Sequence, residues 1–107
     1  MKVMTVQHWD SGKDGVLTEQ AMRRKLEQLG YRVTRYVYAP GTYFPSHTHP
    51  TDKIDAVLSG NFRISMSGEA VVLKAGDFIH VPAGAEHSAE VIGDQSVVSL
   101  DGILHPR

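Results

Sequence analysis

Residues 41–60 read GTYFPSHTHPTDKIDAVLSG, and residues 76–87 read GDFIHVPAGAEH. The first segment places His47 and His49 two residues apart in a predicted strand, where alternate side chains point to one face about 6.6 Å apart. The second segment brings His87 to the start of another predicted strand, directly after a turn. Two imidazoles on one strand face can converge on an ion, but solvent-facing or hydrogen-bonded histidines show the same pattern. From the spacing alone, both interpretations stay open.

The chain around these segments is predicted to be β-structure. Val, Tyr, Thr, Phe and Ile gather in short runs after residue 30, separated by Gly, Pro, Asn and Asp. The predicted strands are Tyr31–Ala39, Ser46–His49, Ile54–Leu58, Phe62–Met66, Ala70–Leu73, Phe78–Val81, His87–Val91 and Val97–Leu100. Eight short strands with no helix between them favour an antiparallel barrel or sandwich over parallel βαβ units.

The first 30 residues have a different pattern. Residues 7–15 are polar and glycine-containing, which predicts a surface loop that a short strand precedes. Thr18 can cap a helix that ends near Gly30. Met22, Leu26 and Leu29 form its apolar stripe, which we expect to pack on a sheet. The chain is therefore predicted to be one domain over residues 1–107, with an N-terminal part (1–30) and a β-domain (31–107).

Composition excludes several classes of function. Twelve acidic and eleven basic residues leave a net charge of −1, so no basic field for binding nucleic acid is expected. The absence of cysteine excludes disulfides, thiolate metal sites and cysteine nucleophiles, which leaves the six histidines and the carboxylates as metal ligands. No run approaches the roughly 18 apolar residues of a membrane span, and the N-terminus lacks the apolar stretch of a secretory signal. We expect a cytoplasmic protein that binds neither nucleic acid nor membrane.

The two quoted segments resemble the two motifs of the cupin superfamily, G-x5-H-x-H-x(3,4)-E-x6-G and G-x5-P-x-G-x2-H-x3-N. The matching positions are Gly41, His47, His49 and Gly60 in the first motif, and Gly76, Pro82, Gly84 and His87 in the second. The resemblance implies an all-β fold, a small antiparallel β-barrel of the jelly-roll (double-stranded β-helix) type, with one short N-terminal helix.

The resemblance also implies a divalent metal ion inside the barrel, of which Fe, Mn, Ni and Zn are candidates. Its implied ligands are His47, His49 and His87. The chain departs from the motifs at two positions, because Lys53 replaces the glutamate and Val91 replaces the asparagine. The first departure affects the metal site directly, since a lysine ammonium has no lone pair and repels a dication.

Three interpretations of Lys53 follow. In the first, Lys53 turns away and the metal is held by three histidines plus water, assisted by Asp55, which lies on the same strand face; Asp52 is the weaker substitute. In the second, the site binds no metal, and the histidines with Lys53 and Asp55 hydrogen-bond an organic ligand. In the third, the polar cluster has no function.

The resemblance implies a metal-binding protein that acts on, or senses, a small polar organic molecule. If the protein is an enzyme, the implied activity is oxygen-dependent chemistry at a three-histidine metal centre. The alternative is a non-catalytic module that binds a small, sugar-like molecule without metal. An enzyme needs a titratable group beside the site, for which Asp55, Glu86 and His80 are candidates. Tyrosines and phenylalanines on the strands can shape the cavity or form ordinary core. Open sheet edges, and the frequency of dimers among cupins, predict a homodimer.

Overall fold

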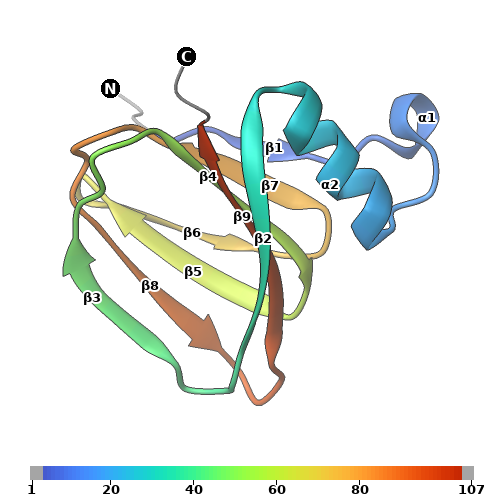
Figure 1. Ribbon diagram of the computed structural model, residues 1–107. Helices are drawn as coiled ribbons and strands as arrows, with labels where there is room; N and C mark the ends of the chain where they lie inside the picture. The colour runs from blue at the N-terminus through green and yellow to red at the C-terminus, as the bar shows by residue number, and fades with distance from the viewer. Residues whose placement is uncertain (1–3, 105–107) are drawn as a thin grey trace.

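The computed structural model describes residues 4–104, and their fold is two facing antiparallel sheets with a helical segment against one of them (Figure 1). Sheet A contains, in spatial order, β1 (Val6–His8), β7 (Asp77–Val81), β4 (Lys53–Ser59), β9 (Val97–Leu104) and β2 (Tyr31–Tyr38). Sheet B contains β3 (Tyr43–His47), β8 (His87–Ile92), β5 (Asn61–Met66) and β6 (Glu69–Leu73). This is the expected jelly-roll arrangement, although among the described residues the sheets do not close into a hydrogen-bonded barrel.

The predicted strands are confirmed, with differences at their ends. The expected strand Ser46–His49 instead starts at Tyr43 and ends at His47, shortly before Pro50, which has no N–H to donate to a ladder. The last strand continues to Leu104, because β9 pairs with β2 over all eight residues of β2.

The N-terminal part contains more regular structure than the predicted loop. Residues 7–15 include most of β1 and a four-residue helix, α1 (Ser11–Asp14), whose N-cap Asp10 accepts a hydrogen bond from the Gly12 N–H. The predicted helix is confirmed as α2 (Glu19–Gln28), and Thr18 caps it by accepting from the Ala21 N–H. No helix within residues 4–104 is long and apolar enough to span a membrane.

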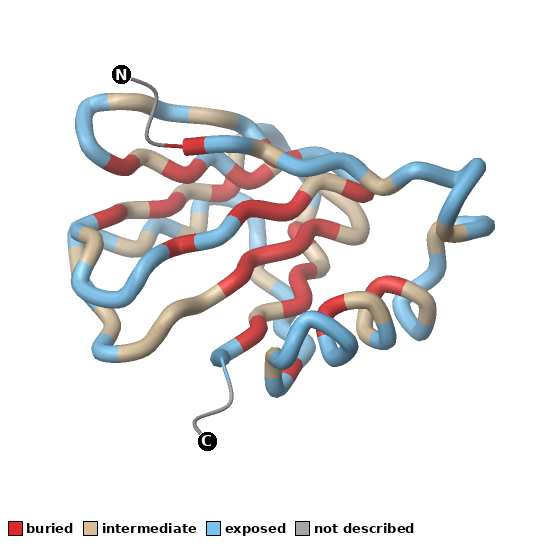
Figure 2. The backbone as a smooth tube through the Cα atoms, turned by 90° about the horizontal axis from the view of Figure 1, so that it is seen from above, coloured by how far each residue is buried: buried red, intermediate tan, exposed pale blue. Residues whose placement is uncertain are grey.

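The core has two parts, which follow from the strand and helix periodicities. One lies between the sheets and the other between α2 and sheet A, and buried positions run along the strands in Figure 2. Met22 and Leu26 are fully buried in the second part. Leu29 is 53% exposed, so its expected packing is wrong, because it is the C-cap of α2 and follows the last turn that reaches the sheet.

Sheet A has an open edge at β2. β2 ends sheet A in the described part of the chain, and its eight residues include exposed Tyr36 and Val37. An unpaired strand edge of this length can pair with another chain. The homodimer stays a prediction.

Candidate metal centre and its cavity

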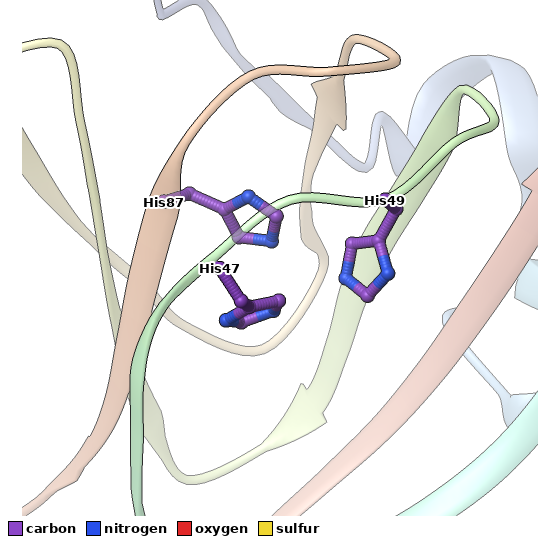
Figure 3. Close-up of side chains that lie close together, drawn as sticks. All are labelled: His47, His49 and His87. Carbon is purple, nitrogen blue, oxygen red and sulfur yellow. The ribbon is translucent and has the colours of Figure 1, made fainter.

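The three motif histidines lie together at one end of sheet B. His47 ends β3 and His87 begins β8, and the antiparallel register places these two residues directly opposite each other. His49 lies two residues beyond the end of β3 and turns back toward them (Figure 3). The ring centroids lie 4.3 Å (His47–His87), 4.7 Å (His47–His49) and 5.1 Å (His49–His87) apart. One nitrogen from each residue lies within 4.8 Å of the other two.

Backbone contacts set the tautomer of two of these imidazoles. His47 Nδ1 lies 2.6 Å from the Pro45 carbonyl oxygen, and His87 Nδ1 lies 2.9 Å from that of Ala85. A carbonyl oxygen only accepts hydrogen bonds, so each Nδ1 carries the proton and donates it. In the neutral ring Nε2 then keeps its lone pair. A donated Nδ1–H of this kind is the usual support of a metal-binding histidine.

The surroundings of His49 and His87 favour their neutral form. Burial, together with the Lys53 ammonium and the neighbouring imidazoles, lowers the pKa of His49. Burial likewise lowers the pKa of His87, against the opposing effect of its hydrogen bond to Ala85. Since only a neutral imidazole can bind a metal, these two residues are in the ligand-competent state near neutral pH.

The histidines line a cavity of about 270 Å³ that lies between the sheets. Sheet B contributes His47 and His87, while sheet A contributes the polar side chains Lys53, Asp55 and Asp101. The aromatic lining residues are Tyr36, Tyr38, Phe44 and Phe62. Of the strand tyrosines and phenylalanines considered from the sequence, these four line the cavity, whereas Tyr43 and Phe78 do not. The space suits a small organic molecule with polar and apolar parts.

Lys53 lines this cavity, so the first of the three interpretations is wrong in having Lys53 turn away. Its Nζ lies 3.7 Å from Asp101 Oδ2, and its side chain is 16% exposed. Lys53 and Asp55 are two residues apart on β4 and share a face, and that face also contains Asp101 of the neighbouring strand β9. The ion pair with Asp101 holds the ammonium on the cavity wall.

Asp55 lies where its strand position predicted, on the cavity face of β4, and is 8% exposed. Its carboxylate is not part of the three-histidine group, so its role as a metal ligand stays a prediction. Burial and the opposing carboxylate of Asp101, partly offset by Lys53, raise the pKa of Asp55 to about 7.

The other candidates lie outside the cavity. His80 is exposed and its Nε2 lies 3.4 Å from Asp52 Oδ2, while Glu86 borders a separate surface hollow beside Ser46 and Ser65. His8 pairs with Asp77 at 2.6 Å, and His105 lies outside the described residues. Asp55 is therefore the one titratable candidate from the sequence that faces the cavity within residues 4–104.

The sequence interpretation missed Asp101. It accepts hydrogen bonds from Ser99 Oγ (2.8 Å) and from the Tyr38 hydroxyl (3.3 Å) in addition to its ion pair with Lys53. The alternation of Val97, Ser99 and Asp101 places all three on one face of the strand, which was the available signal. That signal alone does not say which polar residues on other strands they meet.

The chain belongs to the cupin family, since the family model for the cupin domain matches residues 34–102. No curated protein matches it in sequence. The solved structure of KdgF from Halomonas sp. is similar, with 23% identity and a TM-score of 0.62 over 72% of each chain. An RmlC-like cupin from Shewanella frigidimarina has 23% identity and a TM-score of 0.63, over 73% of this chain and 68% of that one.

A third similar structure is the DMSP lyase DddQ from Ruegeria pomeroyi. It has 25% identity and a TM-score of 0.64, over 71% of this chain but 39% of that chain. These likenesses establish the jelly-roll fold.

Proposed function

We propose that this cupin binds one divalent metal ion through His47, His49 and His87 and uses it to hold a small polar organic molecule in the adjoining cavity. The observation that carries the proposal is the convergence of three imidazole nitrogens within 4.8 Å. Zinc–nitrogen bonds of about 2.0–2.1 Å place tetrahedral ligand atoms about 3.3 Å apart, so small rotations of the rings would close them on one ion.

The donor set fits such an ion. Two of the imidazoles have their Nδ1 protons engaged by backbone carbonyls, which leaves Nε2 free. When bound, a divalent ion at three imidazoles supplies a Lewis acid with positions open to substrate, water or oxygen. The chain's own contribution is to orient the imidazoles and to line the remaining space with aromatic and acidic side chains.

Lys53 is the main electrostatic obstacle to metal binding, and Asp101 reduces it. The ammonium repels a cation at the histidines, but its ion pair with Asp101 offsets part of that charge. The same ammonium favours a second candidate function, a ligand-binding module without metal, in which Lys53 and the histidines hydrogen-bond an organic ligand directly. An oxygen-dependent reaction at the three-histidine centre is the catalytic form of the first proposal.

Metal analysis of protein purified without an affinity tag tests the proposal. We expect one ion per chain, or one taken up from Fe²⁺, Mn²⁺, Ni²⁺ or Zn²⁺ in calorimetric titrations. His87→Ala and His49→Ala should each lose at least tenfold in affinity, because each removes one of three donors. His80→Ala is the matched control, since His80 is exposed and outside the cavity. Uptake of none of the four metals by the wild type would refute the metal site and favour the metal-free binding module.

A further inference from the structure

Two carboxyl groups face each other on the sheet A wall of the cavity. Asp55 of β4 and Asp101 of β9 are direct partners in the antiparallel register. Side chains of such partners stand about 4.5–5.5 Å apart at Cβ and on the same face. Both residues line the cavity, and Asp55 is 8% exposed. Two carboxylates this close, with little access to water, do not both ionise readily.

The surroundings of the two carboxyl groups differ. Asp101 receives hydrogen bonds from Ser99 and Tyr38 and an ion pair from Lys53. On the other side of β4, the register partner of Asp55 is the apolar residue Ile79 of β7. Asp55, buried beside an apolar neighbour and the Asp101 carboxyl group, is therefore the member of the pair that holds the proton.

The histidines lie across the cavity on the other sheet. His47 and His87 belong to sheet B, whereas the two aspartates belong to sheet A. Because residues of both sheets line the cavity, a molecule that filled it would contact both walls. Neither carboxyl group belongs to the three-histidine group, so the geometry of the pair is defined without a metal ion, and its protonation is a property of the metal-free protein.

We propose that Asp55 and Asp101 share one proton and act as the acid–base group of this cavity, exchanging that proton with the ionisable hydroxyl of a small hydroxyl-bearing molecule held between the sheets. The proposal rests on the proposed function in that the cavity must admit such a molecule. In the accepting direction, which starts from the pair after it has lost its proton, the ligand O–H bond breaks, its electron pair stays on the ligand oxygen, and the proton bonds to the Asp55 carboxylate. The donating direction is the reverse, and neither needs a co-reactant.

The charge environment suits exchange near neutral pH. The titratable or charged groups that line the cavity with Asp55 in the described residues are Asp101 on β9, Lys53 on β4, Tyr36 and Tyr38 on β2, His47 on β3, His49 beyond it and His87 on β8. Burial and Asp101 raise the pKa of Asp55 to about 7 despite Lys53. A general acid or base is most effective when its pKa lies near the working pH.

The shared proton is tested on metal-free protein by following the side-chain carboxyl ¹³C resonance of Asp55 with pH. We expect a midpoint near 7, against an ordinary value of about 3.9. Asp101→Asn should lower the midpoint by roughly one pH unit or more, because it removes the opposing charge and frees Lys53. Asp94→Asn, at an exposed bend, should leave it unchanged. An ordinary midpoint, or no response to Asp101→Asn, would overturn the shared proton.

Proton exchange with a ligand is tested with acetohydroxamic acid, a small molecule with an ionisable hydroxyl, binding to the zinc-loaded protein at pH 8. Calorimetry in buffers of different ionisation heat counts the protons released. The wild type should release fewer protons than Asp55→Asn, by up to one per site, because Asp55 retains the proton lost by the hydroxyl. Equal release, or no binding of the acid to zinc-loaded protein, would overturn the exchange.

Failure of the proposed metal centre can be distinguished from failure of the shared proton. A wild type that takes up no zinc refutes the metal centre, while the titration of Asp55 in metal-free protein still decides the carboxyl pair. The dispersion of the amide spectrum shows whether Asp55→Asn folds. If it does not fold, Asp101→Asn replaces it in the proton count and should also release more protons than the wild type.

Discussion

Lys53 is the residue at which this chain departs most from the cupin motif, and its charge dominates the wall beside the histidines. Its ammonium is 3.7 Å from Asp101, and it adds to burial, the larger cause, in lowering the pKa of both His49 and His87. An ion pair at this distance neutralises the charge only in part. Lys53 therefore opposes both protons and metal ions at the imidazoles.

Replacing Lys53 by glutamine should strengthen metal binding. The variant removes a positive charge and leaves the charge of Asp101 without its ion-pair partner, so the affinity for Zn²⁺ should rise by roughly fivefold, or about 1 kcal/mol. Calorimetric titration of the metal-free protein measures it. Lys74→Gln, which removes an exposed lysine outside the cavity, should leave the affinity unchanged. An unchanged or weaker affinity in Lys53→Gln would contradict the electrostatic role given to Lys53.

At the scale of elements, the site involves one strand pairing and one tight turn. The β3–β8 pairing sets His47 opposite His87, and the β4–β5 turn directly follows the strand that carries Lys53 and Asp55. Gly60 forms that turn with φ of 84°, a backbone conformation that residues with a Cβ rarely adopt. A Cβ at Gly60 would lie 2.5 Å from the Ser96 carbonyl oxygen and 3.0 Å from Val97 Cα, both backbone atoms.

Gly60→Ala should therefore destabilise the protein more than a comparable turn substitution. We expect a loss of about 3 kcal/mol or more in the free energy of unfolding, from conformational strain plus the backbone clash. Gly41→Ala is the control, because Gly41 has nearly the same φ of 82° with no atom within 4 Å of the added Cβ. Its loss should be limited to about 1–2 kcal/mol. Equal losses in urea unfolding would show that the approach of Ser96 is unimportant.

For the whole molecule, the buried carboxyl of Asp55 couples stability to pH. The pKa of Asp55 is about 7 in the folded protein, and an unfolded aspartate has about 3.9. Between roughly pH 4 and 7 the folded state thus holds a proton that the unfolded state has lost. The free energy of unfolding falls as pH rises through this window, by at most about 1.4 kcal/mol per pH unit.

Asp55→Asn should remove this slope. Urea unfolding of metal-free protein at several pH values between 4 and 7 should show the variant gaining stability relative to the wild type as pH rises. The lowered pKa values of His49 and His87 act in the opposite direction, costing stability as pH falls below about 6.5, and this contribution cancels in the comparison. Asp94→Asn should keep the wild-type slope. Parallel pH profiles for wild type and Asp55→Asn would contradict the prediction.

The sequence alone predicted the strands, the helix α2 and the three histidines. Strand and helix periodicities are local, as are the Thr18 cap and the turn signals, so each is readable within a few residues. The glycine, proline and histidine spacings of residues 41–60 and 76–87 resemble one family, to which the chain belongs. The resemblance therefore reached His47, His49 and His87 without knowledge of the sheet order.

Only the tertiary structure decided where Lys53 points and which carboxylate it meets. The contact of Lys53 with Asp101, and of Asp101 with Asp55, depends on β4 and β9 being neighbours in sheet A. Strand order and register are set by the packing of the whole core, since burial on one face fixes which residues of distant strands align. The polar wall opposite the histidines is therefore a property of the assembled sheets, which no single stretch of the sequence contains.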